Sequence, residues 1–286
     1  MKVLENVDLK KYNTYGIGGI TKYLVSPSNV DDLEYLLKYL NEQNTFWYIL
    51  GGGSNVILPD EDFNGVIIRL DKLDEFSIDG DIITVGAGIS LGKFVKNMLD
   101  NGFTNYGALS GIPGLLGGAI IGNAGAYGVS VFDYLINVTI MDDLGNIRVL
   151  EKSNIKYDYR YTEFKGGKNI IVAATFQGIR GDVAEELEKI SDNMAKRRST
   201  QPLEYKNAGS VFKNPPRASA GYLIEHAGLK GISVGGAKVS EKHANFIINY
   251  NNATSNDIKK LIDIIKGEVK KKFNEELELE QVIVKW

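Results

Sequence analysis

Residues 107–128 read GALSGIPGLLGGAIIGNAGAYG, with eight glycines in 22 positions. The whole chain has 32 glycines in 286 residues, about 11% against ~7% in typical proteins. Glycine lets a backbone approach a ligand closely and adopt positive φ, at a cost in conformational entropy. Such a concentration in one stretch therefore predicts a loop that lies against a ligand.

The same stretch lies within an uncharged segment, Asn101 to Phe132, in which Gly114, Gly118 and Gly122 have the spacing of a membrane helix pair. The segment contains nine glycines, and only half of its residues are apolar. A spanning helix should be predominantly apolar. We therefore expect a buried irregular loop and no membrane insertion.

A second glycine-rich stretch, Gly51 to Asn55, follows the apolar run from Phe46 to Leu50. Consecutive backbone N–H groups in such a loop can form an anion-binding nest, although a flexible hairpin turn has the same composition. Taken with Ser110–Gly114 and Gly122–Gly128, the loop favours a long ligand with a pyrophosphate and an attached planar ring.

The composition excludes several classes of function. With 33 basic and 36 acidic residues the net charge is −3, which gives no reason to expect nucleic acid as a partner. Cysteine is absent, so disulfides, thiolate metal sites and cysteine nucleophiles are excluded. With only His226 and His243 present, no metal site is expected. The N-terminus shows no signal peptide, and the expected location is the cytoplasm.

Periodicity and turn signals predict alternating helices and strands, with a domain boundary near 180–190. Leu33, Leu36, Leu37 and Leu40 share one helical face, and Ser28 with Asp31 predicts a capping box before it. Other predicted helices cover residues 91–99, 183–194, 218–227 and 255–273. Predicted strands cover residues 46–50, 66–68, 82–85, 136–141, 147–150, 170–176, 209–213, 245–249 and 277–284.

In the second half, Ser210 lies between a glycine and an apolar strand and is followed by Lys213 and Asn214. An ordinary surface strand would look similar. The pattern G-x-S-x-G is absent, so the serine is not predicted to sit in a nucleophile elbow. No histidine lies within a few residues to activate it, although a distant partner stays open.

An ordered set of motifs spans almost the whole chain: YNTYGIGG (12–19), LGGGSN (50–55), SGIPG (110–114), GNAGAYG (122–128), YR (159–160), GSVFKNP (209–215), AGYLIE (220–225) and VSEKHANF (239–246). In this order the set resembles the UDP-N-acetylenolpyruvylglucosamine reductase (MurB) family. The short connection between Arg160 and Ser210 is similar to the type that lacks an extra tyrosine-bearing loop.

The resemblance implies an α/β + α+β fold: a two-part FAD-binding region of the vanillyl-alcohol oxidase (PCMH) type and a C-terminal substrate-binding domain. On this basis residues 1–66 form the first FAD-binding subdomain, joined by the strand 277–286. Residues 67–180 form the second subdomain, and residues 190–276 form the substrate-binding domain.

The resemblance also assigns site residues. The implied catalytic residues are Arg160, Ser210 and Glu280. The implied substrate-binding residues are Tyr127, Arg160, Lys213 and Asn214. The implied cofactor-binding residues are Gly51, Gly52, Gly53, Ser54, Asn55, Ser110, Gly111, Ile112, Pro113, Gly118, Gly122, Asn123, Gly125 and Ala126.

The chain departs from the family pattern in two places. The usual tail Glu-Val-Arg-Ile-Ile-Gly is here Glu280-Gln281-Val282-Ile283-Val284-Lys285, so Glu278 is a rival for Glu280. We prefer Glu280 because residues 282–284 then cover the closing strand. A lysine is common before Gln201-Pro202, but this chain has Thr200, and Arg198 is a candidate to replace it.

The implied activity is NADPH-dependent, FAD-mediated reduction of UDP-N-acetylglucosamine enolpyruvate to UDP-N-acetylmuramate in peptidoglycan precursor synthesis. Its partners are small molecules, with no obligate protein partner evident, and the absence of cysteine predicts non-covalent FAD. Two alternatives stay open at this point. The first is another flavin oxidase or dehydrogenase of the same fold, and the second is a non-catalytic nucleotide-sugar binding homologue.

Overall fold

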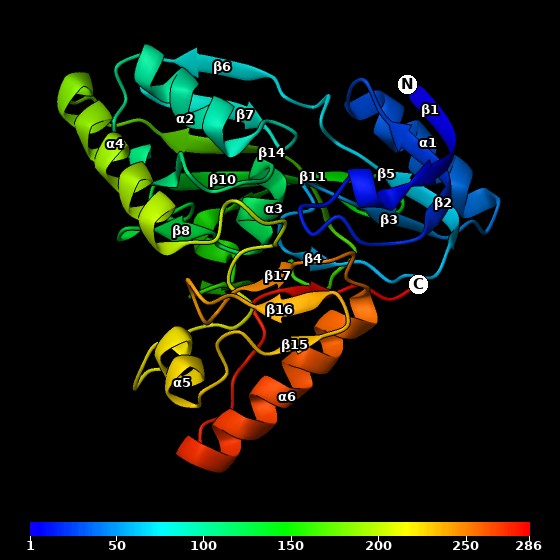
Figure 1. Ribbon diagram of the computed structural model, residues 1–286. Coiled ribbons are helices and arrows are strands. Elements are labelled where there is room, and N and C mark those ends of the chain that lie inside the picture. The colour runs from blue at the N-terminus through cyan, green and yellow to red at the C-terminus, as the bar shows by residue number, and fades with distance from the viewer. The chain divides into compact units, whose positions relative to one another are not determined.

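A computed structural model describes all residues from 1 to 286, and the chain folds into two compact units (Figure 1). Unit 1 contains Met1–Glu5, Tyr23–Gly52 and Asn64–Ala195. Unit 2 contains Asn6–Lys22, Gly53–Phe63 and Lys196–Trp286. Each unit is therefore assembled from segments that are distant in sequence. No helix in the chain has the length and apolar character needed to cross a membrane.

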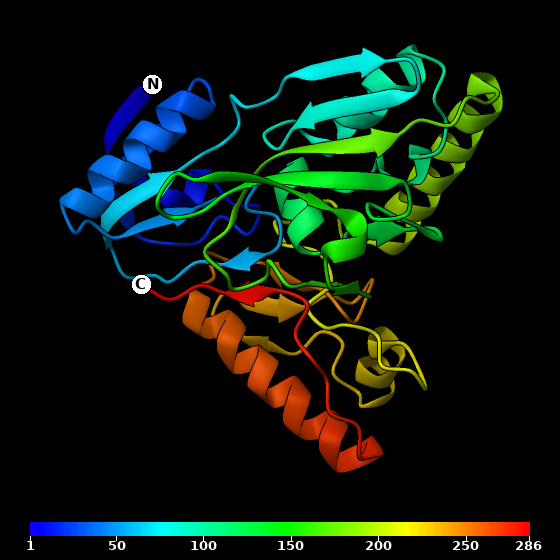
Figure 2. The same ribbon diagram turned by 180° about the vertical axis from the view of Figure 1, so that it is seen from behind.

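A five-stranded antiparallel sheet forms the larger part of unit 1. Its strands are β6 (Phe76–Asp79), β7 (Ile82–Gly86), β10 (Leu135–Met141), β11 (Ile147–Glu151) and β14 (Ile170–Gln177). They lie side by side in the order β11–β10–β14–β7–β6 (Figure 2). The predicted hairpin between β10 and β11 is confirmed. Its turn is closed by Asp142 Oδ1, which accepts the N–H groups of Leu144 and Asn146, both at 2.9 Å.

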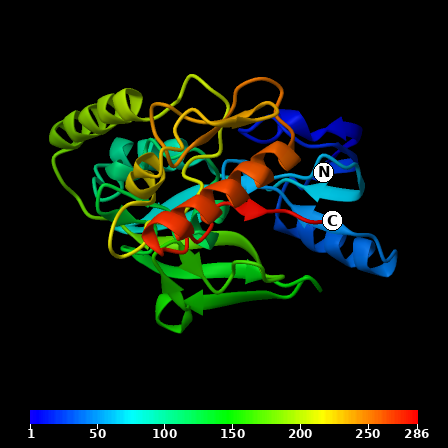
Figure 3. The same cartoon turned by 60° about the horizontal axis from the view of Figure 1, so that its bottom comes forward.

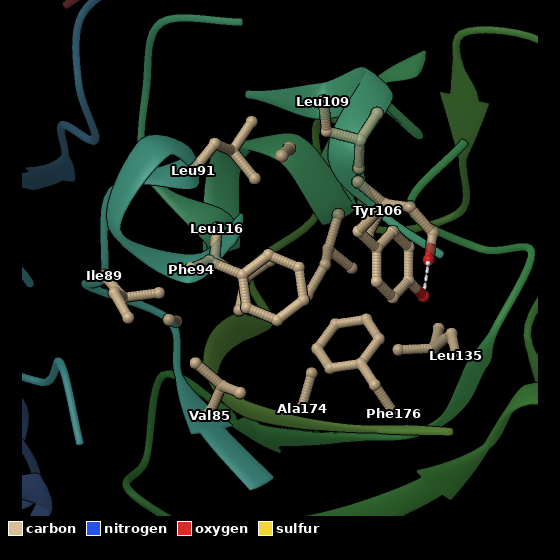
Figure 4. Packing of buried hydrophobic residues seen from close by; sticks show 14 of the residues in the cluster. Val85, Ile89, Leu91, Phe94, Tyr106, Leu109, Leu116, Leu135, Ala174 and Phe176 are labelled. Carbon is tan, nitrogen blue, oxygen red and sulfur yellow. Dashed lines mark hydrogen bonds between the residues drawn. The ribbon is translucent and has the colours of Figure 1, made fainter. Parts of the chain in front are cut away.

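Two helices contribute to the core of this sheet, α2 (Leu91–Asp100) and α3 (Leu116–Ile121). As predicted, Ser90 caps α2, and its hydroxyl accepts the N–H of Lys93. Phe94 of α2 lies 5.2 Å from Phe176 and 5.3 Å from Tyr106 between ring centroids, and all three side chains are fully buried (Figure 4). Burying each ring stabilises the fold by roughly 1.5–3 kcal/mol. This core therefore gives the glycine-rich segment that follows α2 a rigid support.

The stripe of apolar residues predicted after position 180 does form a helix, α4 (Val183–Thr200). None of its side chains is fully buried. Val183, Leu187 and Ile190 instead line a groove of about 330 Å³ together with residues of α2. The stripe is therefore helical, as predicted, and Val183 and Ile190 pack as partly buried residues against the core of unit 1.

A smaller sheet contains β1 (Lys2–Asp8), β2 (Ile20–Ser26), β5 (Phe63–Ile68) and β3 (Trp47–Ile49), in that order. The helix α1 (Val30–Glu42) buries the four leucines that the periodicity places on one face. The predicted capping box of Ser28 and Asp31 is wrong by one residue. The N-cap is Asn29, whose Oδ1 accepts the N–H of Asp32 at 2.8 Å, because the first helical residue is Val30.

Unit 2 contains the sheet β15 (Ser233–Val234), β16 (Ala237–Val239) and β17 (Ile247–Asn249), which is antiparallel throughout. The helix α6 (Ser255–Phe273) packs against this sheet, and its bounds agree with the prediction (Figure 3). Thr254 and Asp257 form a full capping box at its start. The shorter helix α5 (Ala220–His226) packs against α6.

Two predicted strands of unit 2 are much shorter than expected. Residues 209–213 form no regular strand and make a single bridge, Phe212 with Leu279. The backbone N–H and C=O of Phe212 are instead paired with the side-chain amide of Asn245, at 3.0 and 2.8 Å. The predicted strand 277–284 is reduced to β18 (Val282–Ile283), which pairs in parallel with β4 (Val56–Ile57). The Asn245 side chain therefore takes the place of a neighbouring strand beside Phe212.

The remaining elements are short. They are η1 (Leu9–Lys11), η2 (Gly107–Leu109), η3 (Lys152–Asn154), β8 (Gly125–Ala126), β9 (Val129–Ser130), β12 (Tyr157–Asp158) and β13 (Tyr161–Thr162). The division into residues 1–66 with 277–286, 67–180 and 190–276 stays a prediction. The pairing of β18 with β4 supports its placement of the C-terminal strand with the first part.

Candidate active site

The loop after β3 contains two glycines that cannot carry a side chain, for different reasons. A Cβ on Gly52 would lie 2.7 Å from the Cα of Gly114, which is backbone and cannot rotate away. Gly53 has φ +66° and would place its Cβ against the backbone of Tyr12. Nearby, Arg69 Nη1 donates to the carbonyl of Gly51 at 2.9 Å. The loop conformation therefore depends on glycine at both positions.

The glycine-rich segment of unit 1 presents an open backbone face on α3. A Cβ on Gly118 would meet nothing within 4 Å, and one on Gly122 would meet only the carbonyl of Gly118 at 3.6 Å. Residues four apart lie on the same face of a helix. The protein therefore leaves room over this face, and its glycines are not required by packing within the chain. Ser110, Gly111, Ile112 and Pro113 form the loop that leads from η2 towards this helix.

Asn123 follows this face in the left-handed conformation, with φ +40°. Its Nδ2 donates to the carbonyl of Asp158 at 2.9 Å. Its Oδ1 is buried and has no hydrogen-bond partner. A buried acceptor without a donor costs about 1–3 kcal/mol. This atom therefore marks a place where a ligand N–H or O–H would be stabilising.

Arg160 is positioned by the tight turn between β12 and β13, at φ +54°. Its Nη2 donates to the carbonyl of Gly125 at 2.6 Å and its Nη1 to the carbonyl of Asn123 at 3.3 Å. The guanidinium also lies 5.0 Å from the ring centroid of Tyr159. These contacts fix the plane of the guanidinium against the predicted cofactor-binding loop.

Tyr127 lies in the same loop, between Ala126 and Gly128, and is also left-handed, with φ +51°. Its hydroxyl donates to the carbonyl of Asn193 in α4 at 3.0 Å, and its side chain is partly exposed. The bond holds the loop and α4 together within unit 1.

Ser210 and Glu280 belong to unit 2, and the structure brings their segments together. The N–H of Glu280 donates to the carbonyl of Val211 at 2.9 Å, directly after Ser210. The N–H of Val211 donates to the carbonyl of Asn245 at 2.9 Å. Both side chains are half-buried. Asn55, predicted to bind the cofactor, also contacts this segment, because its Nδ2 donates to the carbonyl of Glu280 at 3.3 Å.

Glu278, the rival carboxylate, has a different environment. Its side chain is 72% exposed and pairs with Lys213 Nζ at 2.6 Å. Asn214, the neighbour of Lys213, accepts the N–H of Ala220 through Oδ1 at 3.0 Å. Lys213 and Asn214, both predicted to bind the substrate, therefore each have an interaction partner within unit 2.

At the other departure from the family pattern, the Thr200 hydroxyl donates back to the carbonyl of Lys196 at 2.7 Å. Lys242, which lies in the motif VSEKHANF but has no role assigned from the sequence, donates through Nζ to the carbonyl of Arg198 at 2.6 Å. A cationic group therefore lies beside this helix end, although it comes from a distant segment.

Comparison with known proteins agrees with this geometry. Residues 21–151 match a family model of FAD-binding domains, and residues 201–284 match the C-terminal domain of UDP-N-acetylenolpyruvoylglucosamine reductase. The reductase of Caldanaerobacter subterraneus is 40% identical over 283 residues, covering 99% of this chain and 94% of the relative. The chain belongs to the UDP-N-acetylenolpyruvoylglucosamine reductase family.

Two further relatives support membership of this reductase family. The reductase of Carboxydothermus hydrogenoformans is 40% identical over 97% of this chain and 92% of its own length. A crystal structure of the Thermus caldophilus reductase superposes with a TM-score of 0.83, at 29% identity, over 99% of this chain and 98% of that one. The predicted family and fold class are confirmed.

The residues of unit 1 fit FAD, the cofactor of this reductase family. The open face of Gly118 and Gly122 admits a planar group close to the backbone, and the unpartnered Asn123 Oδ1 can accept an N–H of a flavin ring. Both histidines belong to unit 2 and cysteine is absent, so unit 1 offers no histidine or cysteine for covalent attachment.

Proposed function

We propose that this chain reduces UDP-N-acetylglucosamine enolpyruvate to UDP-N-acetylmuramate with NADPH as the reductant and FAD as the cofactor. The observation that carries the proposal is the hydrogen bond from the Glu280 N–H to the Val211 carbonyl. It brings the two segments that hold a hydroxyl and a carboxyl side by side, within a domain that matches the reductase C-terminal domain. The product is a precursor of peptidoglycan, and the proposed place of action is the cytoplasm, which the co-substrates NADPH and a nucleotide sugar favour.

Bound FAD supplies the hydride chemistry that side chains cannot provide. Within unit 1 we assign its binding to Gly51, Gly52 and the loops 110–113 and 118–126. The steric limits at Gly52 and the open face at Gly118 and Gly122 support this assignment. The FAD is held without a covalent bond.

Arg160 is assigned to the carboxylate of the enolpyruvyl group. A guanidinium presents donors in a planar fork that matches a carboxylate. The carbonyls of Asn123 and Gly125 fix the plane of that fork beside the predicted cofactor-binding residues. Arg160 thereby stabilises negative charge as it grows on the carboxylate.

Ser210 is assigned as the proton donor. Addition of a hydride at carbon 3 of the enolpyruvyl ether leaves an electron pair at carbon 2, delocalised into the carboxylate. The Ser210 hydroxyl donates its proton to carbon 2 and is then reprotonated from solvent. A neutral hydroxyl is a weak acid, so the transfer requires a strongly basic carbon and close placement.

Glu280 is assigned as a second donor to the same developing charge. A carboxyl group can donate only when protonated, and burial favours the protonated form. The half-buried Glu280 fits this role better than Glu278, which is exposed and paired with Lys213. Tyr127, Lys213 and Asn214 are proposed contacts of the nucleotide-sugar part of the substrate.

The two alternatives are not favoured. Another flavin oxidase of the same fold would not need residues 201–284 to match the reductase C-terminal domain. A binding protein without catalysis would not need a hydroxyl and a carboxyl to be retained on hydrogen-bonded segments.

The activity is tested on purified protein under anaerobic conditions. We expect a yellow protein that NADPH bleaches and that the enolpyruvyl nucleotide sugar restores to yellow, with a product two mass units heavier than that substrate. NADH in place of NADPH serves as a comparison of the two reductants. Bleaching without recovery of colour on addition of the sugar would contradict the substrate assignment.

A further inference from the structure

Gln281, the residue after Glu280, is a polar side chain that is only 2% exposed. Its Nε2 donates to the carbonyl of Ala208 at 3.0 Å and to that of Gly209 at 3.2 Å. Its Oε1 accepts the hydroxyl of Tyr15 at 3.1 Å. Every polar atom of the side chain thus has a partner, and all of these partners lie within unit 2.

The two carbonyls bound by Gln281 immediately precede Ser210. On the other side of Ser210, the Val211 carbonyl accepts the backbone N–H of Glu280. Glu280 and Gln281 therefore form hydrogen bonds with the backbone on both sides of Ser210. This matters because Gly209 has φ +74° and Ser210 lies outside any regular strand, so no β-ladder holds the serine in place.

Tyr15 determines which way the Gln281 amide faces. Its hydroxyl is fully buried, and burial raises its pKa well above the ordinary value, so it keeps its proton and remains a donor. A donor at this place requires the amide oxygen, which leaves the amide nitrogen for the two carbonyls. The backbone of Tyr15 is itself held, because Asn249 Nδ2 donates to its carbonyl at 2.9 Å.

We propose that Gln281, oriented by Tyr15, is a positioning residue that holds the Ser210 hydroxyl in place for proton transfer. The proposal rests on the proton-donor role assigned to Ser210 above. Proton transfer needs a donor within hydrogen-bond reach of the acceptor atom, and a misplacement of about 1 Å can cost about 10²-fold in rate. Loss of the Gln281 bonds releases the carbonyls of Ala208 and Gly209 without removing the serine, while the Gly209 N–H keeps its bond to Asn207 Oδ1.

The test separates the two half-reactions of the FAD-loaded enzyme by anaerobic stopped flow. In Gln281→Leu, which is close in size and loses all three bonds, we expect reoxidation by the enolpyruvyl nucleotide sugar to slow at least about tenfold. Reduction by NADPH should stay within about twofold, because it needs no proton from Ser210. Tyr15→Phe should show the same pattern with a smaller loss.

The control variant is Tyr106→Phe in unit 1. Tyr106 is as deeply buried as Tyr15, and its hydroxyl donates to the Val131 carbonyl at 3.1 Å. Tyr106→Phe therefore removes a buried hydroxyl without touching the Ser210 segment, and both half-reactions should keep wild-type rates. If Gln281→Leu does not fold, the reoxidation rates of Tyr15→Phe and Tyr106→Phe are compared to test the positioning role.

A second readout does not depend on activity. Hydrogen–deuterium exchange of the peptide covering residues 205–214 should become faster in Gln281→Leu and Tyr15→Phe, and should be unchanged in Tyr106→Phe. Equal slowing of both half-reactions, or wild-type reoxidation together with unchanged exchange, would overturn the positioning role.

Ser210→Ala, measured beside these variants, tests the proton-donor role of Ser210 separately from the positioning role of Gln281. If Ser210→Ala slows reoxidation and the Gln281 variants do not, the positioning role is wrong while the proton-donor role stands. If Ser210→Ala reoxidises at the wild-type rate, the proton-donor assignment fails, and the positioning proposal falls with it.

Discussion

The two units place their functional groups by different means. In unit 1 the predicted cofactor-binding residues from Ser110 to Ala126 follow a well-packed core, and the open face at Gly118 and Gly122 leaves backbone exposed. In unit 2 Ser210 and Glu280 lie on irregular segments that are held by the buried amide side chains of Asn245 and Gln281. Substitutions that add atoms at Gly52 and Gly122 should therefore be most harmful to flavin binding, and substitutions that remove hydrogen bonds should be most harmful to chemistry in unit 2.

The largest expected effect is that of Gly52→Val. A Cβ at this position would lie 2.7 Å from the Cα of Gly114, so the loop cannot keep its conformation. We expect protein without flavin, or no folded protein at all. The absorbance ratio at 450 and 280 nm and a thermal melt measure the two outcomes.

Gly122→Ala sharpens this prediction, because the chain has room for a methyl group there, with the nearest atom at 3.6 Å. The apoprotein should fold with a melting temperature near that of wild type, while flavin affinity falls. Full flavin content in Gly122→Ala would show that the open face of α3 does not hold the cofactor.

The second prediction removes the proposed proton donor in unit 2. Ser210→Ala should lower the rate of flavin reoxidation by the enolpyruvyl sugar about 10²–10⁴-fold, the usual contribution of general acid catalysis. Bleaching by NADPH should persist. Ser210→Cys should recover part of the rate, since a thiol is more acidic although larger. Equal slowing of both half-reactions would indicate that Ser210 shapes the pocket rather than donates a proton.

The elements that the sequence predicts well are those set by local rules. The helix α6, the helix α2 with its Ser90 cap and the hairpin of β10 and β11 depend on residues within a few positions of each other. The predicted strand 209–213 is not regular, because Asn245 supplies a side chain where a neighbouring strand was expected.

The Gln281 bonds could not be predicted from the sequence for the same reason, since Tyr15 and Gln281 are 266 positions apart. The only sequence signal was a glutamine at the edge of an apolar tail. The motifs identify Ser210 and Glu280 by resemblance, but the groups that hold them emerge only when distant segments are placed together.

The third prediction concerns the pH dependence caused by His243, a residue of unit 2. Burial, and then the charge of Lys230, lower the pKa of His243, while Glu225 partly opposes the shift. Below the ordinary pKa of about 6.5 the unfolded chain binds a proton that the folded chain does not, so stability falls as the pH decreases. Because the ring is only half-buried, we expect a loss below about 1 kcal/mol between pH 7.5 and 5.5.

Urea unfolding of wild type and His243→Asn at several pH values measures this loss. Asparagine keeps an acceptor for the backbone N–H of Asn245, which His243 Nδ1 accepts at 3.3 Å, and it does not titrate. The free energy of unfolding of His243→Asn should vary less with pH below 6.5. Parallel pH profiles for the two proteins would show that His243 does not cause the loss.

The smallest expected effect concerns a glycine at which a substitution neither adds a clash nor removes a hydrogen bond. Gly267 lies within α6, has no positive φ, and a Cβ there would meet nothing within 4 Å. Glycine in a helix interior costs about 0.5–1 kcal/mol relative to alanine, mainly through backbone entropy. Gly267→Ala should therefore stabilise the protein by about that amount, with flavin content and both half-reactions unchanged. Urea unfolding measures the gain. A loss of stability would mean that this face of α6 is covered in solution, and that the glycine there is required for close approach, as Gly52 is in unit 1.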